Sequence, residues 1–241
     1  MNPEPLGIGR LISGTVRLSI ASLRPLFLIA FLPALLSAAV AGMAGPGAAA
    51  EGPTGPGLWA GVIDLVLGTL VAGVLCLGAL DVRLGKRHGF DAYLRQAARH
   101  FLPLLVFGLV LSIAIGIGIV FLILPGLYVA GRYMPYVVTT VFEDRGWQGT
   151  NRAEELTQGY RWPLAWTLVL FGVLMIGFFL AIGVPLMVAG AGLGLVPTIL
   201  VSAALTAFAY VVFAAFSAVV YLRLRELREG VGAAQIAAEI A

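Results

Sequence analysis

The chain alternates between six long apolar runs and short segments that hold almost all of its charge. A membrane-spanning helix needs about 20 mostly apolar residues, and each run is close to that length. A helix also satisfies its own backbone hydrogen bonds, as lipid requires. The pattern therefore predicts an all-α, polytopic membrane protein with a single integral membrane domain, residues 1–241, and transmembrane helices at residues 25–42, 58–80, 101–124, 126–142, 163–188 and 196–221.

The third and fourth runs are separated only by Pro125-Gly126. One straight helix over residues 101–142 would be about 63 Å long at 1.5 Å per residue. That is twice the thickness of the hydrocarbon core, about 30 Å. Because proline removes a backbone donor and glycine permits positive φ, we expect the chain to reverse at this dipeptide. The fourth run is short, so it either crosses the bilayer or forms a re-entrant hairpin with the third.

The first run has a second interpretation as a secretory signal sequence. Ala39-Val40-Ala41 is similar to a signal-peptidase site. The segment before the run is long and patterned, however, whereas a signal peptide begins with a short basic region. We therefore expect a retained membrane helix.

Amphipathic segments precede the odd-numbered runs and predict interfacial helices at 6–23, 88–100 and 150–162. In the first, arginines recur every seven residues, opposite Ile8, Leu11, Ile12 and Ile20. In the third, Asn151 and Glu154 have the spacing of a helix N-cap and its capping partner. The predicted architecture is three hairpins, each preceded by a cytoplasmic interfacial helix, with lipid contacts from Arg10, Arg17, Arg24, Arg95, Arg99, Arg161 and Trp162.

Composition and charge agree with a membrane protein. Apolar residues make up 60% of the chain and charged residues 11%, against roughly 25% in ordinary soluble domains. The net charge is +3, but the bases flank apolar runs, which indicates topology signals and anionic-lipid contacts rather than nucleic-acid binding.

The distribution of bases predicts the topology. Fourteen of the fifteen Lys and Arg residues fall on one side of the six-span arrangement, and the connections 43–57, 125–126 and 189–195 contain none. The positive-inside rule then places both termini in the cytoplasm. The fifteenth base, Arg132, lies within a span.

Residues 124–166 combine several short motifs in a characteristic order. Pro125-Gly126 is followed by an aromatic residue and Arg132, then Glu143 and Gly146, and then Leu-Thr-Gln-Gly at 156–159 before Trp162. This stretch resembles the bacterial integral membrane family that includes the glycerophosphoryl diester phosphodiesterase membrane domain and its YciC-like relatives. The resemblance implies a multi-span protein of the bacterial inner membrane, without the separate soluble domain expected to carry out phosphodiesterase chemistry.

Two charged residues lie within predicted spans, at equal depth on parallel helices. Asp64 and Arg132 are each about six residues from the start of their runs, which permits an ion pair. With Tyr128 and Tyr136 one turn to either side of Arg132, they form a candidate polar site for an anionic headgroup or a small anion. The alternative is a structural pair that joins two helices and binds nothing.

Evidence for catalysis is thin. His88 and His100 are too few for a zinc site, and Cys76 has no base near it in sequence, so we expect no enzyme, no metal and no cofactor. The leading hypothesis is an accessory membrane protein that organises lipid or docks to and stabilises a membrane complex. The alternative is a transporter or lipid-handling protein that uses the Asp64 and Arg132 region. The predicted partners are membrane lipids, mainly anionic headgroups, and a membrane protein complex.

Overall fold

A computed structural model describes residues 6–44, 56–86, 88–121 and 123–239. This part of the chain is helical and contains no strand. Two short elements interrupt the α-helices: the 3₁₀ turn η2 (Gly146–Gln148) and the π-helical turn η3 (Phe179–Gly183). The α-helices are α1 (Ile8–Ala44), α2 (Pro56–Leu84), α3 (Phe90–Arg99), α4 (Phe101–Phe121), α5 (Ile123–Tyr133), α6 (Tyr136–Val141), α7 (Gly149–Thr157), α8 (Arg161–Phe178), α9 (Val184–Leu193), α10 (Leu195–Glu229) and α11 (Ala233–Glu239).

Five helical stretches among the described residues are long and apolar enough to cross a membrane. They confirm an all-α chain with several helices of membrane-spanning length. Most of the 43–57 connection, residues 45–55, lies outside the described residues. The five stretches are Ile8–Gly42, Gly61–Leu84, Phe101–Gly118, Arg161–Leu193 and Leu195–Glu229.

Helix α1 joins two elements that the sequence predicted separately. The interfacial helix 6–23 and the span 25–42 form one helix of 37 residues, with Pro25 and Pro33 inside it. Each proline removes one backbone hydrogen bond, but the buried face of α1 packs on both sides of Pro25 against neighbouring helices and keeps the helix continuous. Ile20, predicted on the apolar face, is 67% exposed instead.

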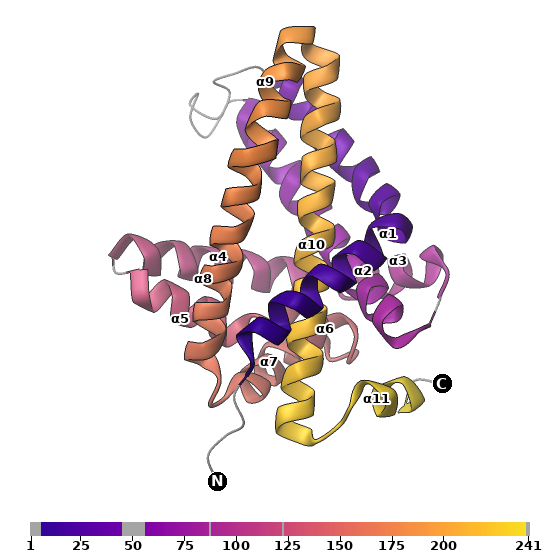
Figure 1. The fold of residues 1–241 in the computed structure, drawn as a ribbon, viewed down its shortest axis with the longest axis vertical. Coiled ribbons are helices and arrows are strands. Elements are labelled where there is room, and N and C mark those ends of the chain that lie inside the picture. Colours follow the sequence, from indigo (N-terminus) through magenta and orange to yellow (C-terminus); the bar gives the residue numbers. More distant parts are fainter. Residues whose placement is uncertain (1–5, 45–55, 87, 122, 240–241) are drawn as a thin grey trace.

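The core forms where α10 packs against α1 and α2 (Figure 1). Small side chains on α10 are fully buried, which lets the helix axes approach closely. The chain enters α10 through Gly194, whose φ of 111° is one that residues with a side chain rarely adopt. In Figure 1, α8, α9 and α10 form one long hairpin with this turn at its end. The fully buried small residues of α10 include Ala203, Ala207, Ala215 and Ala218.

The fourth predicted span is not one helix. Helix α5 ends at Tyr133 and α6 begins at Tyr136, with Met134 and Pro135 between them. Helix α5 has 11 residues, or about 16 Å, which is half the hydrocarbon thickness. The structure therefore does not confirm a sixth span over residues 126–142.

Helices α4 and α5 pack as a hairpin that extends sideways from the long α8–α10 hairpin in Figure 1. A Cβ on Gly118 would lie 2.6 Å from the backbone nitrogen of Gly126, so the two helices are in close contact there. The reversal lies before Pro125, which occupies the first turn of α5. Proline suits that position because the amide it lacks has no helical partner there.

Two of the three segments predicted as interfacial helices are helical, in shorter form. The 88–100 prediction corresponds to α3, and the 150–162 prediction to α7. The predicted N-cap is wrong: Asn151 lies inside α7, which begins at Gly149. Gly149 is required there, because a Cβ would lie 2.2 Å from Oγ1 of Thr140.

Candidate functional site

Arg132, at the end of α5, forms an ion pair with Glu154 on α7. Oγ1 of Thr157 also donates a 2.7 Å hydrogen bond to the carbonyl oxygen of Arg132. Both contacts fix the end of α5 against α7. The ion pair between Arg132 and Asp64 that the sequence permitted is therefore not present. The equal depth of Asp64 and Arg132 was based on a fourth run that starts at the outer face of the membrane. In the structure, Arg132 instead lies at the end of α5, beside α7.

Asp64 lies on α2 and has a different partner. Oγ of Ser37, on α1, donates a 2.7 Å hydrogen bond to its carboxylate. This contact joins α1 to α2 and gives the exposed carboxylate of Asp64 one hydrogen-bond donor. Asp64 and Arg132 thus do not form one site.

Arg161, the first residue of α8, completes the cluster around Glu154. Its Nη2 lies 3.2 Å from Oε1 of Glu154, and its Nη1 donates a 2.8 Å hydrogen bond to the hydroxyl of Tyr128. The rings of Tyr128 and Trp162 pack 5.6 Å apart. We call Arg132, Glu154, Arg161 and Tyr128 the α5–α7–α8 junction.

The junction depends on close backbone packing. A Cβ on Gly131 would lie 2.6 Å from the carbonyl oxygen of Arg161 and 3.0 Å from the nitrogen of Ala165. Only glycine allows α5 to approach α8 this closely. The hydrogen bond from Arg132 lowers the pKa of Glu154, and the positive charge of Arg161 acts in the same direction. The arrangement is a carboxylate shared by two arginines, which suits helix anchoring.

Tyr136 lies apart from the junction, on α6. A Cβ on Gly108 of α4 would lie 3.1 Å from its hydroxyl oxygen. Of the four residues predicted to form the polar site, the structure brings together only Arg132 and Tyr128, through Glu154 and Arg161.

A second ionic network links the segment after α6 to the end of α10. Glu143, whose side chain is only 10% exposed, accepts 2.8 Å hydrogen bonds from Nε of Arg152 and the hydroxyl of Tyr221. Arg152 also pairs with Glu229, which lies 2.7 Å from Nε of Arg225. Sequence analysis assigned no role to these carboxylates, because their partners lie up to 78 residues away in the chain.

The two histidines each contact a carboxylate. Nε2 of His100 lies 2.5 Å from Asp144, a residue with φ of 53°, and this contact lowers the pKa of Asp144. Nδ1 of His88 lies 2.5 Å from Asp81, which also accepts a 2.6 Å hydrogen bond from Tyr93. In the described part of the chain, no group of three or more His, Cys, Asp or Glu residues could hold a metal ion.

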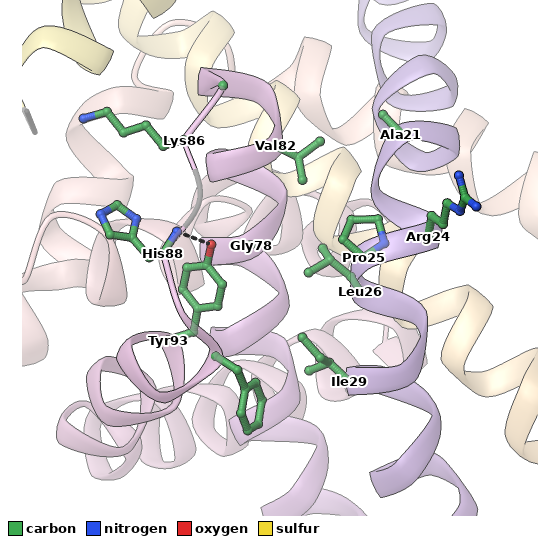
Figure 2. Close-up of a pocket in the computed structure, with 12 residues that line it drawn as sticks. Ala21, Arg24, Pro25, Leu26, Ile29, Gly78, Val82, Lys86, His88 and Tyr93 are labelled. Carbon is green, nitrogen blue, oxygen red and sulfur yellow. Dashed lines mark hydrogen bonds between the residues drawn. The ribbon is translucent and has the colours of Figure 1, made fainter.

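A cleft of about 670 Å³ lies between α1 and the α2–α3 segment. Figure 2 shows Leu26 and Ile29 extending from α1 toward the side where Tyr93 of α3 lies. Two cations belong to its lining: Arg24 on α1 and Lys86 after α2. Sequence analysis named Arg24 as a lipid contact but could not detect the cleft, since the residues of its two walls are 49 to 72 positions apart in the chain.

The arginines differ in whether a carboxylate neutralises them. Those of the junction and of the second network are paired with glutamates. Among the described residues, no carboxylate pairs with Arg10, Arg17 or Arg24, and all three are exposed. The guanidinium group of Arg161, predicted to contact lipid, is instead bound to Glu154 and Tyr128. Trp162, also predicted to contact lipid, is exposed.

Comparison of the chain with family models, with curated proteins and with solved structures gives no match.

Proposed function

We propose that this chain is a non-enzymatic accessory protein of the bacterial inner membrane that binds anionic lipid headgroups through the exposed arginines of α1. The observation that carries the proposal is the stripe formed by Arg10, Arg17 and Arg24, at seven-residue spacing on the exposed face of one helix. Positions seven apart on a helix lie within about 20° of each other. Exposed guanidinium groups beside an apolar helix are suited to bind the phosphates of an anionic leaflet.

The exposed face of α1 has no arginine after Arg24, although Val16 and Ile20 are already 54% and 67% exposed beside the stripe. Leu28 and Leu32 are 68% and 67% exposed, on the same face as Arg24. A change from arginine to leucine along an exposed helix face is expected where the helix passes from the headgroup region into hydrocarbon. We therefore place Arg24 at the level of the lipid phosphates.

We further propose that four helical segments cross the bilayer: α1, α2, α8 with α9, and α10. Each has arginines at or near one end only: the first half of α1, the end of α2, the start of α8 and the end of α10. The ion pair between Arg152 and Glu229 supports this, because it joins α7, just before α8, to the end of α10. The positive-inside rule then gives cytoplasmic termini.

In this topology, α4 and α5 do not cross the bilayer: they form a hairpin that starts and ends on the cytoplasmic side and extends sideways from the crossing α8–α10 hairpin (Figure 1). Its two ends support this: His100, just before α4, contacts Asp144, and Arg132 at the end of α5 pairs with Glu154. Helix α5 is also too short to cross. Arg132 then joins the other fourteen bases on the cytoplasmic side. The family resemblance of residues 124–166 is consistent with an inner-membrane protein and stays part of this proposal.

Because Asp64 and Arg132 have separate partners, no shared site supports the transporter alternative. The accessory role is tested by lipid selectivity. The protein is reconstituted in nanodiscs of mixed phosphatidylglycerol and phosphatidylcholine, and the lipids it retains after extraction are quantified. We expect enrichment of phosphatidylglycerol in the wild type and its loss when Arg10, Arg17 and Arg24 are all changed to Gln.

A charge-conserving variant provides the control. Changing the same three arginines to Lys keeps the positive charge, so enrichment should be largely retained and should fall with added salt. If the wild type retains both lipids in the proportions supplied, the proposed function is wrong.

A further inference from the structure

We propose that the cleft between α1 and the α2–α3 segment binds the headgroup of one anionic phospholipid, with Arg24 as the partner of its phosphate. This rests on the proposed function, which names lipid headgroups as the ligand class. The new element is one defined binding site in the cleft, whereas the proposed function requires only that lipid headgroups are attracted along the arginine stripe of α1.

The shape of the cleft suits a headgroup. Helices α1 and α2 touch at its base, where a Cβ on Gly78 would lie 2.6 Å from Cδ2 of Leu26. The space beside this contact is bounded by the segment after α2 and by α3. Its volume of about 670 Å³ falls within the range of ordinary ligand pockets, roughly 300–1,000 Å³.

The lining matches an amphiphile. Pro25, Leu26 and Ile29 form an apolar wall on α1, and Val82 of α2 adds to it (Figure 2). The exposed face of α1 continues from the cleft into Leu28, 68% exposed. A soluble anion would gain nothing from these surfaces, whereas the acyl chains of a lipid would lie along them.

The unneutralised charge of the cleft is positive. Arg24 is exposed and has no carboxylate partner among the described residues, so its side chain is free to turn over the opening. The buried Nζ of Lys86 has no hydrogen-bond partner in the described part of the chain. In Figure 2, Arg24 extends from α1 on the side away from α2, and Lys86 extends away from α1, so Arg24 has to turn across the opening to contact a bound headgroup.

No carboxylate is among the described residues that line the cleft, and Asp81, which contacts the lining residues His88 and Tyr93, is engaged by them. The carboxylate of Asp81 receives the backbone amide of His88 at 3.2 Å and the hydroxyl of Tyr93 at 2.6 Å, with Nδ1 of His88 at 2.5 Å. The carboxylate of Asp81 is therefore already satisfied. A phosphate at Arg24 would form charge-assisted hydrogen bonds, which guanidinium groups make in pairs.

The test measures retained lipid on the full chain by native mass spectrometry after release from nanodiscs containing phosphatidylglycerol and phosphatidylcholine. We expect one tightly held phosphatidylglycerol in the wild type. Arg24→Gln should reduce its occupancy about tenfold, which corresponds to about 1.4 kcal/mol, the order of magnitude of one hydrogen bond to a charged group. Ala21→Trp, which fills the cleft without changing charge, should reduce it equally.

Arg17→Gln is the matched control, because it removes the same charge from the same exposed face outside the cleft lining. It should leave the tightly held lipid in place. Arg24→Lys should retain the lipid at reduced occupancy. If Ala21→Trp fails to fold, the comparison of Arg24→Lys with Arg24→Gln still tests whether Arg24 binds the lipid.

Equal loss in Arg17→Gln and Arg24→Gln would overturn the cleft site while leaving general headgroup binding intact. Displacement of the lipid by millimolar inorganic phosphate would show that the site takes free phosphate and would overturn the lipid assignment. No preference for phosphatidylglycerol in the wild type would refute both this inference and the proposed function.

Discussion

Arg132 and Glu154 form an ion pair between the end of α5 and helix α7, 22 residues apart in sequence. The pair determines how the fourth apolar run is arranged. It holds the end of α5 beside the segment that leads into α8, so α4 and α5 return to the region from which they started. A bundle with six crossings would instead separate Arg132 from Glu154 by much of the bilayer.

Removing this pair should destabilise the protein in a way that depends on both residues. We expect Arg132→Gln and Glu154→Gln each to lower the free energy of unfolding, with a coupling energy of about 1 kcal/mol in a double-mutant cycle. The measurement is equilibrium unfolding in SDS titrations of the detergent-solubilised protein.

The same cycle with Asp64→Asn in place of Glu154→Gln is the control. Asp64 bonds to Ser37, so its effect should add to that of Arg132→Gln without coupling. Coupling between Asp64 and Arg132, with none between Glu154 and Arg132, would contradict the structure.

The pair also predicts a dependence on pH. The pKa of Glu154 is lowered in the folded protein, chiefly by the hydrogen bond from Arg132. Its contribution to stability is therefore complete above the unfolded pKa, about 4.3, and is lost as the pH falls through the lower folded value. The difference in thermal stability between wild type and Glu154→Gln should shrink between pH 6 and pH 3. A difference that stays constant over this range would show that the carboxylate charge contributes nothing.

The close contact between α5 and α8 should not tolerate a side chain. Gly131→Ala places a Cβ 2.6 Å from a backbone oxygen of α8, so α5 must shift. We expect a loss of about 1–3 kcal/mol in SDS unfolding. Gly172→Ala on α8, where nothing lies within 4 Å of the added Cβ, should cause no loss. Equal effects of the two substitutions would mean that α5 does not pack against α8 as described.

The sequence predicted those features that depend on local composition. The apolar runs, the amphipathic helix at α3 and the reversal near Pro125 all follow from residues within one or two helical turns. Pro25 was misleading because a proline at the edge of an apolar run resembles a helix start, whereas buried residues on both sides of it keep α1 continuous.

The candidate site could not be predicted in the same way. Depth arguments for Asp64 and Arg132 assumed a full crossing by the fourth run, and the break at Met134-Pro135 removes that assumption. The partners of Arg132 and Glu143 are set by tertiary packing, which one sequence does not contain. The interpretation of Asn151 and Glu154 as a capping pair concealed the actual role of Glu154. The only local signal for that role was Arg161, a base seven positions later in the chain, with which Glu154 pairs.

The account depends most on the side of the membrane that each segment reaches, and cysteine accessibility in intact cells measures this directly. Single cysteines are introduced at Ser13, Leu124, Leu193 and Gly232 in a Cys76→Ala background and treated with a membrane-impermeant thiol reagent. We predict labelling from outside only at Leu193, which is 76% exposed beside the α9–α10 turn, labelling at Ser13 and Gly232 only after the cells are opened, and labelling of Leu124 only after detergent is added. External labelling at Leu124 would show that the α4–α5 hairpin crosses the bilayer, and external labelling at Ser13 or Gly232 would contradict the proposed topology altogether.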